Sequence, residues 1–590
     1  MEYSAIYHDM NKYYCYAVSK NTFNIRLKVK REDIKQVILH YQDKYIPVHM
    51  KDTRKTKKMN LCIRDFSNDY FETRIKIDMV CLRYYFEIVD NDGIKTYYGN
   101  HSFYNDDITD IGMMFDCPQT TREQEIFAAP EWAYNSVAYQ IFTARYASSK
   151  NIDDKIWYKK KLSYKDDFCG DLKGITENLS HIKELGADVI YLTPVFKSTS
   201  IHKYNTTDYY MIDPSFGTKE DLITLVKEAH TMNIKVILDA VFNHSGTDFF
   251  AFSDLMENKE KSRYYNWYYI DDRYPLKAEY GKMGYKCFSY FGGMPKLNLT
   301  NEEVRTYFID VAKYWINETN IDGWRLDVGD EIGHDFWRQF RKEIKSLKKD
   351  AFIVGEIWHN AREYLMGDEW DSVMNYDFFM AAKAFLVDKS IKASGFIDQL
   401  QHLYATHYKE SADLLWNLID SHDTDRFMHI CNKDINIFKI AVAMMLLFPG
   451  VPMIYYGDEY GMDGGHDPDN RRGMVWKETY QNKHIFEWFK NIIAIRKLYP
   501  CISHGEHVST ASIDLEDVVM FTNRDNNNTV TVLFNAGCNV VDVTKRDDLS
   551  VREFNNYHFD ISKLINFKNL CNNDKFNGIV KPFDIAIIVE

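Results

Sequence analysis

The sequence predicts an α/β protein: a (β/α)8 TIM barrel with an inserted subdomain, an N-terminal β-sandwich and a C-terminal antiparallel β domain. Three observations support this prediction. Eight short apolar segments alternate with helical patterns in the middle of the chain, segments of apolar–polar alternation precede and follow them, and one connection is unusually long. A chain of 590 residues is also too long for a single hydrophobic core.

The N-terminal region has the two-residue period that is typical of strands. Residues 24–30 and 71–77 alternate between apolar and polar side chains, and 84–89 leads into a glycine-containing turn at 90–93. We therefore predict a β-sandwich over residues 1–122. Its linker is expected at 116–122, because the period changes after this stretch.

The central region, residues 123–504, is predicted to form the barrel. The eight expected strands are 137–142, 189–194, 235–241, 323–328, 352–356, 372–375, 414–419 and 453–456. The long connection after the third strand is rich in tyrosine and phenylalanine, so an inserted subdomain is expected over about 245–297. Alternation returns at 518–522 and 529–534, which predicts a C-terminal β-sandwich over 505–590.

Composition restricts the partners and the location of the protein. The formal net charge of −13 argues against nucleic acid, because binding phosphate backbones requires clustered cations. The chain has no run of about 18 apolar residues and no signal peptide, so no membrane partner is expected. Ten cysteines without Cys-x-x-Cys spacing indicate reduced thiols and a cytoplasmic location. An aromatic content of 15% favours a cleft for a pyranose ring.

Carboxylates follow three expected barrel strands, at the end of the barrel where active sites lie. Asp327 ends the fourth strand, and Arg325 on the same face is expected to hold it ionised and oriented as a nucleophile. Glu356 ends the fifth strand in an apolar setting that would keep its proton for donation. Asp423 ends the seventh strand and, with His422, would hold sugar hydroxyls. Together these residues predict cleavage of a glycosidic bond.

Two further residues are expected on the same rim. Asp239 and His244 follow the third strand. Taken alone, His244 would be a structural histidine, and each carboxylate could be a turn or capping residue. Three carboxylates at the ends of barrel strands favour the catalytic interpretation.

These segments resemble the four motifs of the α-amylase family, glycoside hydrolase family 13. The motifs stand at 239–244, 323–327, 355–359 and 419–423, in the order of the family, and the resemblance spans essentially the whole chain. It implies a retaining mechanism in which Asp327 forms a glycosyl-enzyme intermediate and Glu356 protonates the leaving oxygen and later activates water. Asp423 would clamp the distorted sugar.

Residues 294–298, Met-Pro-Lys-Leu-Asn, are similar to the motif of the neopullulanase, cyclomaltodextrinase and maltogenic amylase subfamily. This resemblance implies cleavage of α-1,4-glucosidic bonds in cyclodextrins, maltooligosaccharides, pullulan or starch, with mainly maltose-sized products and some transglycosylation. The N-terminal sandwich is similar to the starch-binding-type module of that group, which implies a homodimer formed through this module.

The same resemblance assigns further substrate contacts. His202 and Tyr204 match residues beside the cleaved bond, where Tyr204 would stack on the sugar, and Asp467 and Arg471 match residues deeper on the glycone side. Trp358 is expected to line the subsites that bind the acceptor. Core packing is the alternative for Tyr204 and Trp358.

The chain departs from the family pattern in two places. After the first barrel strand, where many members bind calcium, residue 150 is a lysine whose ammonium would repel the ion. We expect a site that is weakened or replaced by Lys150, although Asp153, Asp154 and Asp171 leave a degenerate calcium site open; catalysis itself is expected to need no cofactor. Residues 328–331 also differ from the family pattern, with Gly and Asp where Ala and Asn are usual. In the family these positions approach the aglycone subsites, so the acceptor preference stays open.

Two other functions stay open from the sequence. A glucanotransferase or an α-1,6-acting oligosaccharide hydrolase would carry the same four motifs. A non-catalytic sugar-binding protein would keep the barrel only as a scaffold. The motif at 294–298 weighs against the first alternative, and the intact carboxylates weigh against the second.

Overall fold

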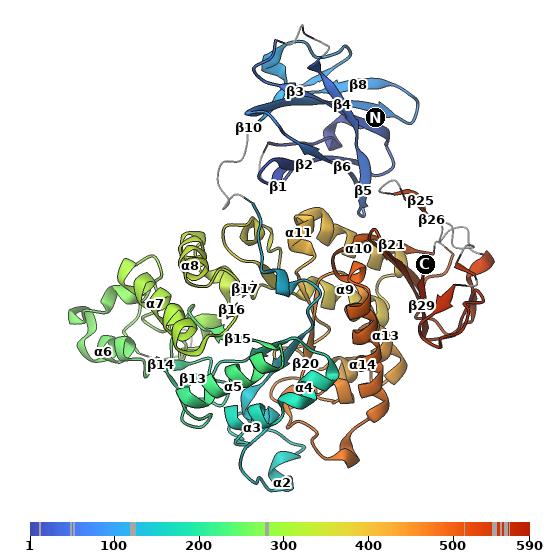
Figure 1. The fold of residues 1–590 in the computed structure, drawn as a ribbon. Helices are drawn as coiled ribbons and strands as arrows, with labels where there is room; N and C mark the ends of the chain where they lie inside the picture. Colours follow the sequence, from blue (N-terminus) through green and yellow to red (C-terminus); the bar gives the residue numbers. More distant parts are fainter. Residues whose placement is uncertain are drawn as a thin grey trace.

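The computed structural model describes all residues except 11–12, 48–49, 51–52, 119–125, 278–281, 513, 546–550, 555–556, 560–563 and 566, and only the backbone of 551–554 and 557–559. Figure 1 shows three regions along the chain: a blue N-terminal layer of strands, a central barrel ringed by helices, and a red C-terminal sheet beside α10 and α13.

The central region is a closed barrel of eight parallel strands in chain order. They are β11 (Ala138–Ile141), β12 (Val189–Leu192), β15 (Lys235–Ala240), β16 (Gly323–Leu326), β17 (Phe352–Gly355), β18 (Ser372–Asn375), β19 (Trp416–Asn417) and β20 (Val451–Tyr455). Each strand overlaps one predicted segment, so the predicted barrel is confirmed. The strands are buried because helices cover the outside of a parallel sheet.

One barrel strand is much shorter than predicted. Residues 414–419 contribute only the two-residue strand β19, whose Asn417 lies opposite Pro452 of β20. The Val451 N–H donates to the Leu415 carbonyl, so the segment still takes its place beside β20 in the barrel.

Several of the helices around the barrel begin at side chains that cap them. The longer ones are α5 (Lys219–Thr231), α7 (Glu302–Thr319), α8 (His334–Leu347), α9 (Tyr376–Leu386), α10 (Ala393–Thr406), α13 (Ile435–Leu447) and α14 (Lys483–Leu498). Thr218 forms a capping box at α5, and Asn301, Asp434 and Asn482 cap α7, α13 and α14. In the described part of the chain, every helix is too short or too polar to cross a membrane.

The N-terminal region consists of two antiparallel sheets. One contains β1 (Cys15–Ser19), β2 (Thr22–Lys30), β6 (Asn68–Lys76) and β5 (Asn60–Arg64); the other contains β4 (Lys55–Lys58), β3 (Ile34–Asp43), β7 (Cys81–Asp90), β8 (Lys95–Tyr98), β9 (Phe103–Tyr104) and β10 (Phe115–Pro118). The predicted linker at 116–122 is wrong in part, because Asp116–Pro118 pair with β7 as β10. Residues 119–122 lie outside the described residues, so the boundary at 122 stays a prediction.

The N-terminal sheets pack on the barrel through α10 and α11 (Lys409–Ala412) (Figure 1). The Arg26 side chain is buried and donates hydrogen bonds to the carbonyl oxygens of Ala405 and His407. Tyr16 stacks on Tyr408 with ring centroids 4.2 Å apart. These contacts attach the N-terminal sheets to the side of the barrel.

The C-terminal region contains a five-stranded sheet in the order β21-β22-β23-β29-β27. Its strands are β21 (Glu506–Ala511), β22 (Val518–Arg524), β23 (Thr529–Asn535), β29 (Asp584–Val589) and β27 (Lys568–Asn569). The two strands expected from sequence alternation, at 518–522 and 529–534, are β22 and β23, which pair antiparallel.

The long connection after β15 contains α6 (Phe250–Asn258) and three short 3-10 turns, η6 (Lys259–Lys261), η7 (Tyr265–Trp267) and η8 (Phe288–Tyr290). A bridge between His244 and Lys296 brings its two ends together. The connection therefore returns to the rim of the barrel where it started.

Candidate active site

A cavity of about 960 Å3 opens at the carboxyl ends of the barrel strands. It is lined by nine of the predicted site residues: His202, Tyr204, His244, Asp327, Glu356, Trp358, Asp423, Asp467 and Arg471. A second cavity, of about 520 Å3, lies at the opposite end of the barrel beside Trp132 and Asp188, and none of the predicted site residues line it. The chemistry is therefore assigned to the first cavity.

The fully buried guanidinium of Arg325 gathers three carboxylates beneath this cavity. Its Nη1 donates to Asp327 Oδ1 at 2.9 Å and to Asp239 Oδ2 at 2.9 Å. Its Nη2 lies 2.6 Å from Glu356 Oε2. Because β15, β16 and β17 are neighbours in the barrel, residues at their carboxyl ends meet around one cation. The structure thus brings Asp327 and Glu356 together.

The charge in this cluster favours retention of a proton. Burial, followed by the charges of Glu356, Asp239 and Asp423, raises the pKa of Asp327 well above its ordinary value, although Arg325 opposes the shift. Burial also raises the pKa of Asp239 to about 6. This differs from the expectation that Arg325 alone would hold Asp327 ionised, because one guanidinium is shared by three carboxylates.

One oxygen of Asp327, a residue that lines the cavity, lacks a hydrogen-bond partner in the described part of the chain. This oxygen, Oδ2, is buried. His244 Nε2 lies 4.0 Å away, but burial lowers the pKa of His244 to about 3, so this approach is not an ion pair at neutral pH. A buried carboxylate oxygen without a partner is costly, and a reacting atom of a substrate could use it.

Glu356 is held by groups on both sides. The backbone N–H of Val328 donates to Glu356 Oε2 at 3.0 Å, and Trp358 Nε1 donates to Oε1 at 3.2 Å. Val328 has a φ of 47°, a left-handed conformation that a β-branched residue rarely adopts, and this conformation accompanies the N–H···O contact with the carboxylate. Trp358 stacks on Tyr376 at a centroid distance of 3.7 Å, with 46% of its surface exposed.

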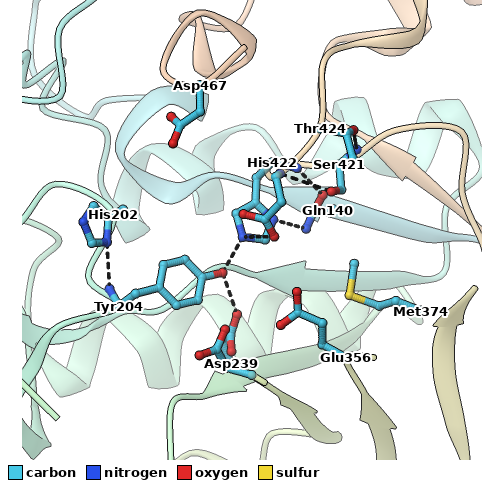
Figure 2. Close-up of polar contacts among 12 residues, drawn as sticks. Gln140, His202, Tyr204, Asp239, Glu356, Met374, Ser421, His422, Thr424 and Asp467 are labelled. Atoms are coloured by element: carbon cyan, nitrogen blue, oxygen red, sulfur yellow. Dashed lines mark hydrogen bonds and ion pairs between the residues drawn. The ribbon is translucent and has the colours of Figure 1, made fainter. Parts of the chain in front are cut away.

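Polar contacts around Tyr204 fix the floor of the cavity. Figure 2 shows the Tyr204 hydroxyl between His422 and Asp239; it donates to Asp239 Oδ2 at 3.1 Å and lies within hydrogen-bond distance of His422 Nε2. Burial lowers the pKa of His202 to about 4 and that of His422 well below its ordinary value, so both imidazoles are neutral at pH 7. Tyr204 lines the cavity and is not simply core filling.

Three charged lining residues of the cavity, Asp423, Asp467 and Arg471, contact one another. Arg471 Nη1 lies 3.0 Å from Asp467 Oδ1, and Arg471 Nη2 lies 3.5 Å from Asp423 Oδ1. Asp423 Oδ2 is also 3.2 Å from His422 Nε2. Burial raises the pKa of Asp423, and Arg471 opposes that shift. This arrangement offers paired donors and acceptors to sugar hydroxyls.

The three aspartates considered as calcium ligands are engaged separately. Asp153 caps α2 (Asp154–Trp157), Asp154 pairs with Lys477, and Asp171 caps α3 (Leu172–Glu177) and binds Ser149. Within the described ranges, no group of three or more His, Cys, Asp or Glu side chains is placed to hold a metal ion. The described side chains therefore offer calcium no clustered set of carboxylates.

The cavity also has lining residues that the sequence did not single out: Tyr164, Lys165, Thr199, Ser200, Ile201, Phe288 and Phe291. Met294 and Val328, which belong to two segments discussed from the sequence, line it as well. Phe288 stacks on His244 at 5.2 Å and lies in the aromatic-rich insertion, which was the signal for it. Tyr164 donates a hydrogen bond to the carbonyl of Asp467. The sequence around Tyr164 contained no motif or periodicity that indicated a cavity-lining residue.

Comparisons with known proteins agree with this geometry. Residues 140–491 match the family model described as alpha amylase, catalytic domain, and residues 1–121 match alpha amylase, N-terminal ig-like domain. A cyclomaltodextrinase of Geobacillus thermopakistaniensis (strain MAS1) is 39% identical over 539 residues, 91% of each chain, and neopullulanase 2 of Thermoactinomyces vulgaris is 40% identical over 507 residues, 85% of each. A solved cyclomaltodextrinase structure superposes with a TM-score of 0.86 at 34% identity, covering 92% of both chains. The chain therefore belongs to the α-amylase family of glycoside hydrolases, enzymes that hydrolyse α-glucans.

Proposed function

We propose that this protein hydrolyses α-1,4-glucosidic bonds with retention of anomeric configuration, by a double displacement. The observation that carries the proposal is the pairing of Asp327 and Glu356 on one buried guanidinium, with Asp327 Oδ2 unpaired at the cavity. Two carboxyl groups about 5 to 5.5 Å apart are what a retaining glycosidase requires. The Arg325 guanidinium lies 2.9 Å from Asp327 Oδ1 and 2.6 Å from Glu356 Oε2, so the two carboxyl groups are neighbours around one cation.

In the first step Asp327 attacks the anomeric carbon, and Glu356 gives its proton to the leaving oxygen. In the second step Glu356 takes a proton from water, which then breaks the bond between the sugar and Asp327. The neutral His202 and His422 and the pair of Asp423 and Arg471 would hold the hydroxyls of the distorted sugar.

The proposed substrates are cyclodextrins, maltooligosaccharides, pullulan or starch, with mainly maltose-sized products. The names of the two relatives and the open cavity of about 960 Å3 support this choice, because the cavity has room for several glucose units. Trp358 and its partner Tyr376 would form the acceptor wall.

The test is product analysis on β-cyclodextrin, pullulan and soluble starch, with proton NMR of the first product before mutarotation. We expect β-cyclodextrin to be opened and the new reducing end to appear as the α-anomer. A β-anomer first product would contradict the double displacement. Formation of longer oligosaccharides as the main product, even without added acceptor, would favour the glucanotransferase alternative.

We further propose that the protein works in the cytoplasm as a homodimer joined through its N-terminal sheets. The match to the N-terminal family model supports this, as do large apolar side chains exposed on those sheets and their loops: Tyr45 (71%), Val80 (65%), Ile94 (58%) and Phe66 (57%). All ten cysteines are free thiols, as a reducing compartment requires. Sedimentation at micromolar concentration should give a species of twice 69.8 kDa; a species of one chain mass alone would exclude the dimer.

A further inference from the structure

Two loops carry the groups on the glycone side of the cavity. His422 and Asp423 lie between β19 and α12 (Phe427–Ile430), and Asp467 and Arg471 lie in the connection after β20. This second loop, described in full as far as Arg471, contains only the short 3-10 turns η11 (Asp458–Tyr460) and η12 (Asp469–Arg471). Loop residues need other contacts to hold a geometry that binds sugar hydroxyls.

Arg426 lies at the meeting point of these two loops, and its side chain is fully buried. Nη1 donates to Asp458 Oδ1 at 2.9 Å, Nε donates to the Asn470 carbonyl at 2.9 Å, and its backbone N–H donates to the Gly464 carbonyl at 2.9 Å. The guanidinium also lies 4.2 Å from the ring centroid of Tyr455. One side chain thus joins the end of β20 to both loops.

Asn470 completes the connection. Its side-chain amide is fully buried and donates to the carbonyls of His422 and Thr424, each at 2.8 Å. The next residue, Arg471, donates through Nε to the same His422 carbonyl at 2.9 Å. The side chains of Asn470 and Arg471 therefore bind the backbone on either side of Asp423. Arg426 in turn donates to the backbone carbonyl of Asn470.

The charge of Arg426 is balanced inside the protein. Asp458 lies beside Asp420, whose Oδ2 accepts the backbone N–H of Phe427 at 2.6 Å. A buried cation needs an anionic or hydrogen-bonding partner, and removal of one partner leaves the other group buried with an uncompensated charge. None of these groups lines the cavity, so Arg426 can act on a substrate only through the loops.

We propose that Arg426 is a positioning residue for the glycone subsites: by fixing Asn470 and Asp458 it sets the position of Asp467 and Arg471 relative to Asp423. The inference rests on the proposed function and adds to it a residue that selects for substrates with a second glucose unit on the glycone side. Loss of the Arg426 contact should weaken binding of that second unit more than binding of the first.

The test compares Arg426→Lys with Arg496→Lys. Lysine keeps the charge facing Asp458 but lacks the separate Nε–H that donates to the Asn470 carbonyl. Arg496 is an equally buried arginine, bonded to the carbonyls of Leu446, Phe448 and Gly450 away from the cavity, and serves as the matched control. The quantity measured is the ratio of kcat/KM for p-nitrophenyl α-maltoside to that for p-nitrophenyl α-glucoside.

We expect Arg426→Lys to lower this ratio about tenfold or more, as loss of a hydrogen bond within a charged network does, and Arg496→Lys to leave it within about twofold. In an Asp467→Asn background, Arg426→Lys should change the ratio by no more than about twofold, because both changes act on one subsite. Equal shifts in both backgrounds, or no shift in a folded variant, would overturn the proposal.

Asn470→Ala provides a second variant if Arg426→Lys does not fold, and it is expected to lower the ratio in the same direction. Turnover of neither glycoside by the wild type would contradict the proposed function instead. The inference would then be decided by calorimetric binding of maltose, which Arg426→Lys should weaken about tenfold and Arg496→Lys should not.

Discussion

Glu356→Gln is expected to lower kcat on β-cyclodextrin by roughly two to four orders of magnitude, the usual contribution of a general acid. Glutamine has the same shape and can still accept the Val328 N–H, but it has no proton to give to the leaving oxygen. The loss should be much smaller for a maltosyl fluoride, because fluoride leaves without protonation. Steady-state kinetics on the two substrates measure the difference.

Glu369→Gln is the matched control for this prediction. Glu369 is another fully buried glutamate of the barrel region, paired with His334 and Arg338 and outside the cavity. Its replacement should leave kcat within a few-fold of wild type. Equal activity of Glu356→Gln and wild type on β-cyclodextrin would remove Glu356 from the mechanism.

Arg325→Ala is expected to lower the free energy of unfolding at pH 7.5 by about 3 to 5 kcal/mol, as breaking a buried ion pair does. The change leaves Asp239, Asp327 and Glu356 buried without their shared cation. The pKa of Asp239 is already raised to about 6 by burial, so its ionisation costs stability as the pH rises through that value. The deficit of Arg325→Ala should therefore be largest above pH 6 and shrink toward pH 5.

Denaturant unfolding of wild type, Arg325→Ala, Asp239→Asn and the double variant measures this effect. If repulsion between carboxylates causes the loss, Asp239→Asn should restore part of the stability that Arg325→Ala removes. A deficit that does not change between pH 5 and pH 8, with no recovery in the double variant, would show that lost packing is the cause.

The barrel and the positions of its site residues were predictable because both depend on local pattern. Buried parallel strands give apolar runs, and residues that end neighbouring strands must meet at one end of the barrel. Asp327 and Glu356 are examples, since β16 and β17 are adjacent. The shortness of β19 was not predictable, because the apolar run at 414–419 continues past the two residues that pair with both neighbouring strands.

The parts that were missed depend on contacts between distant segments. Arg325 was expected to serve Asp327, but only the closed barrel shows that Asp239 and Glu356 share the same guanidinium. Tyr164 reaches the cavity through a hydrogen bond to a carbonyl some three hundred residues later in the chain. The left-handed backbone of Val328, which points its N–H at Glu356, breaks local preference and has no sequence signature.

The measurement that tests the central claim most directly is mass spectrometry of the protein after reaction with an α-glucosyl fluoride that carries a second fluorine on the ring. The added fluorine slows both steps, while the good leaving group lets the first proceed, so a glycosyl-enzyme intermediate should accumulate. We predict one added sugar, located by peptide mapping on Asp327. A label on any other carboxylate, or turnover with inversion and no label, would contradict the account.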